Sequence, residues 1–226
     1  MPTETIGAPA PVRRSRARWP VPAALILLSL IPVFFGAVRL AELPGGAAVT
    51  PQNARFFDSP FPVLIHIPAA IVYSLLGAFQ FVPSLRRGSR GRLGWHRIAG
   101  RILAPAGLLV GLSGLWMAVF YDLPEGDGDM LLVLRLIFGS GMVVSIVLGL
   151  LAIRRRDFVS HSAWMARGYA IGVAAGTQAL VSIPWLLLIG PASELTRAVL
   201  MGSAWVINLA VAEYFIRRRG NPSARG

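Results

Sequence analysis

Two histidines have a spacing that suggests chemistry. His96 and His161 each stand 11 residues before a glycine, Gly107 and Gly172, and this spacing returns to the same face of a helix. Each follows arginines and precedes a long apolar segment. Two neutral imidazoles from separate helices can ligate a haem iron, and nearby arginines can pair with its propionates. The pair therefore suggests a b-type haem protein, with His96 and His161 as axial ligands; the alternative is that both histidines cap helix starts and bind water or phosphate.

Other polar residues lie near the ends of apolar segments, where basic pockets between helices suit phosphate headgroups. One group of candidate ligand-binding residues comprises His96, Arg97, Arg101, His161, Trp164, Arg167 and Gln80, with Glu213 nearby. A second group, at the opposite ends of the segments, comprises His66, Arg39, Arg135 and Gln178. The favoured function is binding or transport of a small anionic or amphipathic, lipid-like ligand. The alternative for these arginines is that they snorkel to the interface.

Several classes of chemistry lack the residues they need. Cysteine is absent, which excludes disulfides, thiolate metal sites and cysteine nucleophiles. The sequence has no His-Glu-x-x-His helix, no aspartate pair, no Gly-x-Ser-x-Gly elbow and no glycine-rich phosphate loop. Whether the chain is an enzyme is left open. Its net charge of +12 comes from arginines that punctuate apolar runs, so we expect no nucleic-acid partner.

Membrane-spanning helices must position these residues. Only 14% of the residues are charged, against about 25% in soluble domains. A bilayer core about 30 Å thick needs about 20 apolar residues in a helix. Six segments reach that length: 21–42, 61–82, 102–121, 131–153, 164–189 and 197–216. The prediction is an all-α polytopic membrane protein with six transmembrane helices over 19–216, between basic tails at 1–18 and 217–226.

The distribution of arginine predicts the orientation. Of the 22 arginines, 18 fall in the two tails, between helices 2 and 3, or between helices 4 and 5. The other side holds four arginines and an acidic turn at 122–129. Because positively charged loops stay in the cytoplasm, both termini are predicted to be cytoplasmic in a bacterial cytoplasmic membrane. Anionic headgroups of membrane lipids are the expected partners on that side. An accessory membrane protein without its own chemistry fits the same pattern.

Small residues predict which helices form the interior, because membrane helices associate where their backbones approach closely. Ladders of such residues occur in helices 3, 4 and 5: Gly107 and Gly111; Gly141, Ser145 and Gly149; Gly168, Gly172 and Gly176. His96 shares a helix face with Gly100, Gly107 and Gly111. These ladders favour a four-helix core of helices 2–5, flanked by helices 1 and 6. Helices 2–3 and 4–5 could be two parallel repeats related by a pseudo-twofold axis.

Three stretches resemble a bacterial family of predicted membrane proteins, domain of unknown function 2306. The stretches are His66-Ile67 with Gly77-Ala78-Phe79-Gln80-Phe81, then His96-Arg97-Ile98-Ala99-Gly100-Arg101, and then 161–170 from His161 to Ala170. Together they span about 61–182. In that family an arginine is common at the positions of Ser162 and Gln178. The resemblance implies the membrane fold and carries no established activity.

Overall fold

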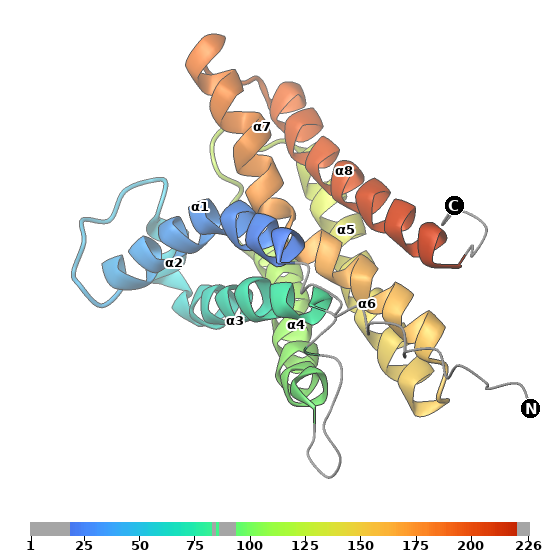
Figure 1. Ribbon diagram of the computed structural model, residues 1–226. Helices are drawn as coiled ribbons and strands as arrows, with labels where there is room; N and C mark the ends of the chain where they lie inside the picture. Colours follow the sequence, from blue (N-terminus) through green and yellow to red (C-terminus); the bar gives the residue numbers. More distant parts are fainter. Residues whose placement is uncertain (1–18, 83–84, 86–93, 221–226) are drawn as a thin grey trace, which may run out of the picture.

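The computed structural model describes residues 19–82, 85 and 94–220. The predicted tail at 1–18, the end of the second tail at 221–226 and the arginines at 86, 87, 90 and 92 lie outside the described residues. The described part is helical (Figure 1). In chain order its helices are α1 (Pro20–Glu42), α2 (Ala54–Asp58), α3 (Pro60–Ala78), the 3₁₀ turn η1 (Phe79–Phe81), α4 (Trp95–Phe120), α5 (Asp129–Arg154), α6 (Phe158–Gly172), α7 (Ala174–Leu188) and α8 (Glu194–Gly220).

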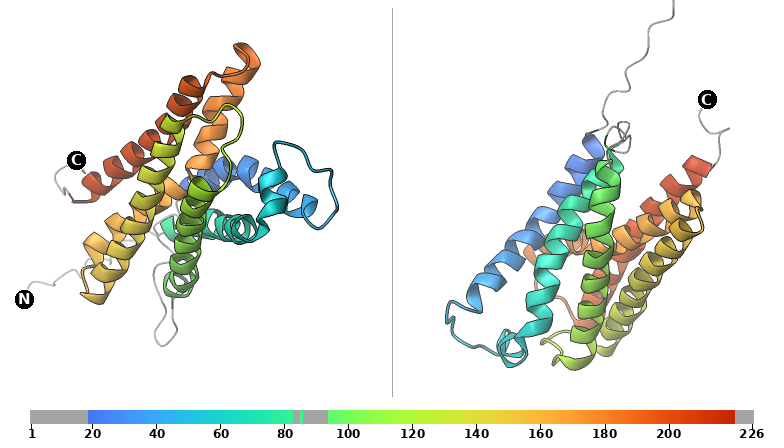
Figure 2. Two further views of the ribbon diagram at one scale, coloured as in Figure 1. Left: turned by 180° about the vertical axis from the view of Figure 1, so that it is seen from behind. Right: turned by 90° about the horizontal axis from the view of Figure 1, so that it is seen from below.

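Six helical stretches are long and apolar enough to cross a membrane, as the sequence predicts. They are Pro20–Glu42, Pro60–Phe81, Trp95–Phe120, Asp129–Arg154, Phe158–Leu188 and Glu194–Arg219. The start of α1 and the end of α8 lie at the same end of the bundle, and the α1–α3 and α4–α5 connections lie at the other (Figure 2, right). A chain with both ends on the same side crosses the bundle an even number of times. Which end faces the cytoplasm stays a prediction.

The interior is formed by the four middle spans, and this part of the prediction is confirmed. In the most apolar window of the first and last spans only 11% of the residues are buried inside the protein, against 28–39% in the other four. The centre of the core is Tyr73 of α3, which is 2% exposed. Around it pack Leu103 and Val110 of α4, Ile146 of α5 and Tyr169 of α6. The proposed twofold relation between the two hairpins stays a prediction.

The glycine ladders are filled by aromatic rings as much as by neighbouring backbones. A Cβ built on Gly107 would lie 2.6 Å from Cε2 of Tyr73, and one built on Gly172 would lie 2.7 Å from its Cε1. A Cβ on Gly77 would fall within 2.3 Å of the ring of Tyr169. Gly100, on the same helix as Gly107, has nothing within 4 Å of its Cβ position.

The fifth span is broken in its middle. α6 ends at Gly172, and α7 begins at Ala174 after Val173, whose φ of −91° and ψ of 4° leave the helical range. Beside the break, the carbonyl of Ala170 accepts a hydrogen bond of 3.0 Å from Nδ2 of Asn208 on α8. Oδ1 of Asn208 accepts in turn from the hydroxyl of Thr177 at 2.8 Å. A backbone group freed inside a membrane needs such a partner, so α8 holds the two halves of the span together.

Candidate ligand-binding cavity

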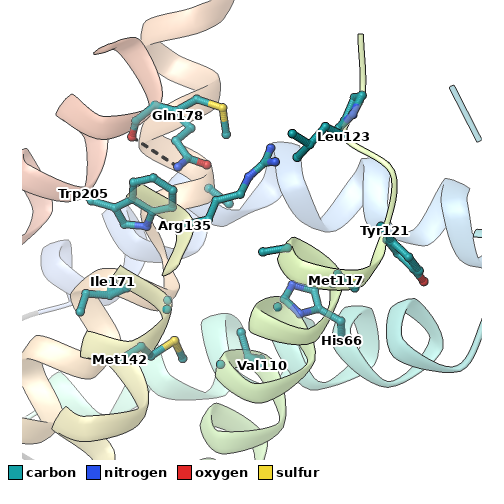
Figure 3. A pocket seen from close by; sticks show the side chains of 18 of the residues that line it. His66, Val110, Met117, Tyr121, Leu123, Arg135, Met142, Ile171, Gln178 and Trp205 are labelled. Atoms are coloured by element: carbon teal, nitrogen blue, oxygen red, sulfur yellow. Dashed lines mark hydrogen bonds between the residues drawn. The ribbon is translucent and has the colours of Figure 1, made fainter. Parts of the chain in front are cut away.

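A cavity of about 340 Å³ opens among α3, α4, α5, α6, α7 and α8, at the end of the bundle where α2 and the α4–α5 connection lie (Figure 3). Its apolar wall includes Val110, Met142, Ile171 and Trp205. The last of these stacks on Phe138, with ring centroids 4.8 Å apart. Its polar lining includes His66, Arg135 and Gln178, three of the four residues of the second predicted group, together with Arg55 of α2. The cavity thus joins an apolar wall to a cationic one.

Arg135 reaches this wall from α5 and is held by a buried carboxylate. Its Nη2 donates to Oδ2 of Asp127 at 2.6 Å, and Nε of Arg197 on α8 lies 2.5 Å from the other oxygen of that carboxylate. The side chain of Asp127 is fully buried. One carboxylate is therefore shared between two guanidinium groups, and the α4–α5 connection is fixed to both α5 and α8.

Arg55 is less well compensated. The ion pairs of the described residues do not include it, and its guanidinium carbon lies 4.6 Å from the centroid of the Phe56 ring. Burial lowers the pKa of Arg55, and the positive charges of Arg135 and Arg39 lower it further, against the opposite effect of Asp127. The guanidinium remains charged at neutral pH in any protein. It is a half-buried cation that favours a nearby anion.

His66 and Gln178 enter the cavity from α3 and α7. Nδ1 of His66 lies 3.0 Å from Oγ of Ser113 on α4. The amide nitrogen of Gln178 makes a long hydrogen bond of 3.4 Å to the carbonyl of Met201 on α8. Each side chain is thereby oriented by a neighbouring helix, which limits the ways in which it can meet a ligand.

Arg39, the fourth residue of that predicted group, lies beside the cavity and does not line it. Its guanidinium forms an ion pair of 2.5 Å with Glu42 and stacks 4.8 Å from the centroid of the Phe56 ring. Phe56 itself lines the cavity. Arg39 therefore supports a wall residue, while its charge is paired with that of Glu42.

The first predicted group lies at the opposite end of the bundle. Arg97 and Arg101 are exposed on α4, while Gln80 of η1 and His96 of α4 are half-buried. On α6, Arg167 donates from Nε to Glu213 of α8 at 2.5 Å, and its guanidinium carbon lies 4.6 Å from the Trp164 ring centroid. Arg167 is therefore already paired with a carboxylate.

The two histidines of the haem hypothesis lie in the first turns of α4 and α6. Nδ1 of His161 donates to the carbonyl of Gly149 on α5 at 2.8 Å, which leaves Nε2 for any ligand. No group of three or more histidine and acidic side chains suited to a metal ion occurs in the described ranges. Haem binding by His96 and His161 stays a prediction.

Sequence reasoning missed part of this cavity. Arg55 belongs to a loop in the sequence, and nothing there shows that the neighbouring Phe56 of α2 packs against Tyr121, just after the end of α4. The acidic turn was used only for orientation, although Asp127 is the one carboxylate in it that bridges two helices. An arginine beside aromatic residues in a short loop, as at Arg55-Phe56-Phe57, is the signal that could have found the first of these.

Comparison with known proteins places the chain in a family. The family model described as predicted membrane protein (DUF2306) matches residues 63–216, which run from α3 to α8 and contain most of the cavity lining. Neither a curated protein nor a solved structure matches the chain. The six-span helical architecture agrees with that description. The chain belongs to the family of predicted membrane proteins DUF2306.

Proposed function

We propose that this membrane protein binds an anionic amphiphile in the cavity between α3 and α8. The observation that carries the proposal is Arg55, a half-buried guanidinium without an ion-pair partner among the described residues, beside a cavity of about 340 Å³. Pockets for small ligands are commonly about 300–1,000 Å³, mostly apolar, with a few polar groups that fix orientation. The size and composition of this cavity agree with that description.

The charges around the cavity favour an anion. Arg39 is neutralised by Glu42, while Arg135 and Arg197 share the single charge of Asp127. Asp122 also lines the cavity, and with it and Arg55 this cluster holds four positive charges against three negative ones. A phosphate or carboxylate at the cavity would pair with Arg55 and with the nitrogens of Arg135 that Asp127 leaves free. Such charge-assisted hydrogen bonds are stronger than neutral ones.

The apolar wall favours a hydrocarbon chain attached to that anion. Trp205, Met142 and Ile171 line the cavity, and Phe138 stacks on the ring of Trp205. Flexible methionine side chains adapt to chains of varied shape. A free inorganic anion would leave this surface without a partner, so an amphiphile satisfies both walls of the cavity.

Native mass spectrometry of the detergent-purified protein tests the proposal. The protein is titrated with phosphatidylglycerol, which is anionic, and with phosphatidylcholine, which has no net charge. We expect the anionic lipid to bind preferentially, and Arg55→Gln to weaken its binding about tenfold, the effect of losing one charge-assisted hydrogen bond.

Arg154→Gln is the matched control. It removes the same charge from the exposed last turn of α5, at the end away from the cavity, and should leave this binding unchanged. Equal effects of the two substitutions would mean that the lipid is held by general surface charge and would overturn the proposal. The absence of any preference for the anionic lipid would favour the accessory-protein alternative. An optical spectrum after addition of haem tests the redox alternative on the same sample.

A further inference from the structure

The hydrogen-bonding direction at Ser113 determines which nitrogen of His66 carries a proton. The hydroxyl of Ser113 donates to the backbone carbonyl of Leu109 and also lies 3.3 Å from that of Val110. A hydroxyl has one hydrogen to donate, so its oxygen can only accept from His66. Nδ1 of His66 is therefore the donor in the 3.0 Å contact. In the neutral ring this leaves Nε2 as an acceptor with a free lone pair.

The second nitrogen belongs to a side chain that lines the cavity. Nδ1 and Cε1 of His66 face α4, where a Cβ on Gly114 would lie 3.4 Å from Cε1. Figure 3 shows the ring on the α4 wall, between Met117 and Val110. Nε2 is thus the nitrogen left for a molecule in the cavity.

A second acceptor lies across the cavity. The amide nitrogen of Gln178 is used by the carbonyl of Met201, so the amide oxygen remains. In Figure 3 this oxygen points toward the side of the cavity where Arg135 lies. The polar wall therefore combines cationic donors at Arg55 and Arg135 with neutral acceptors at His66 and Gln178, and the carboxylate of Asp122 lines the cavity as well.

We propose that the ligand carries hydroxyl groups next to its anionic group, and that Nε2 of His66 and the amide oxygen of Gln178 accept hydrogen bonds from them. This inference rests on the proposed function and names its ligand class, an amphiphile with an anionic, hydroxylated headgroup such as a phosphoglycerol. A phosphate ester without hydroxyls satisfies the arginines but leaves both acceptors unpaired. Sites with such acceptors discriminate against the analogue that lacks the donor.

Two anionic lipids that differ only in headgroup hydroxyls test the inference. Phosphatidylglycerol and phosphatidylpropanol of the same acyl chains have one negative charge and a three-carbon headgroup, and only the first has hydroxyls. Binding of each to the purified full-length chain is measured by native mass spectrometry against phosphatidylcholine. We expect phosphatidylglycerol to bind about tenfold more tightly than phosphatidylpropanol, as expected for two modest hydrogen bonds.

His66→Phe keeps a ring of similar size and removes both nitrogens. It should reduce the discrimination between the two anionic lipids severalfold while phosphatidylpropanol binds as before. Ser113→Ala is the second variant, because it removes the acceptor that fixes the ring and leaves Nε2 in place; it should weaken the discrimination less. If His66→Phe does not fold, Ser113→Ala and Gln178→Leu carry the test.

The outcomes separate the two proposals. If both anionic lipids bind with equal affinity, bind more tightly than phosphatidylcholine and lose affinity in Arg55→Gln, the hydroxyl inference is overturned and the anion-binding function stands. If neither anionic lipid binds more tightly than phosphatidylcholine, the proposed function itself is overturned. Discrimination that survives in His66→Phe would show that the imidazole is not the acceptor and would overturn the inference as stated.

Discussion

Replacing Gly176 with alanine tests the packing of α1 against α7. A Cβ built on Gly176 would lie 2.0 Å from the backbone carbonyl oxygen of Leu28, 2.7 Å from its Cγ and 2.8 Å from its carbonyl carbon. Ordinary contacts begin near 3.4 Å, so α1 would have to move by about 1.4 Å, the difference between the two distances. Two of the three nearest atoms are backbone, which no rotamer change can relieve.

The expected cost follows from the backbone character of the clash. Overpacking in a well-packed interior typically costs about 1–3 kcal/mol, and a clash with main-chain atoms belongs at the upper end. For a chain of this length, about 3 kcal/mol corresponds to a fall in Tm of about 6–12 °C. The measurement is thermal unfolding in detergent, followed by the loss of the monodisperse peak in size-exclusion chromatography after heating.

Gly100→Ala is the control within the same protein. Its Cβ would meet nothing within 4 Å, and alanine is about 1 kcal/mol better than glycine in a helix interior. This substitution should leave Tm unchanged or raise it slightly. A Gly176→Ala protein that unfolds at the same temperature as Gly100→Ala would refute the close approach of α1 and α7 on which the argument rests.

Three further substitutions test the buried polar groups. Asn208→Leu should destabilise the protein by about 1–2 kcal/mol, because the carbonyl of Ala170 then loses the Asn208 amide as a partner inside the membrane. Thr177→Val should destabilise the protein less. Thermal unfolding of the two variants measures the difference, and equal Tm values for the two would contradict the role given to the amide. Tyr73→Phe should be neutral or slightly stabilising, because the buried hydroxyl has no hydrogen-bond partner among the described residues, and a large loss of Tm would show that this hydroxyl has a partner such as a bound water.

The architecture could be predicted from the sequence because hydropathy determines which segments can span a bilayer. The predicted first span, 21–42, differs from α1 by a single residue at its start. The third and fifth spans begin earlier than predicted, at Trp95 and Phe158. Their first turns contain polar residues, which a search for apolar runs excludes, although a helix continues into the interface where such side chains reach water.

The break at Val173 could not be read in the same way. Neither proline nor a charged residue marks it, and Gly172 and Gly176 resemble an uninterrupted packing ladder. Those two glycines in fact receive different neighbours, Tyr73 and the backbone at Leu28. The break lies beside a tertiary contact, the amide of Asn208, that only the folded arrangement shows.

The candidate cavity was partly predictable. His66, Arg135 and Gln178 could be placed at one end of the bundle from their positions in the spans, and the structure brings them to one cavity. Their hydrogen-bonding directions could not be predicted, because they depend on Ser113 and Asp127 in other elements. Sequence gives the depth of a side chain in the membrane, while its partners follow from how the helices pack.

The tie between Asn208 and Ala170 also bears on the order in which the chain is assembled. α8 follows α6 and α7 in the chain, so it leaves the ribosome after them. Until it is inserted, the carbonyl at the interruption has no amide from α8 and must be met by water or by another transient partner. The fifth span can therefore reach its final shape only when the sixth has entered the bilayer, and a nascent chain stalled before residue 208 would hold that span unfinished.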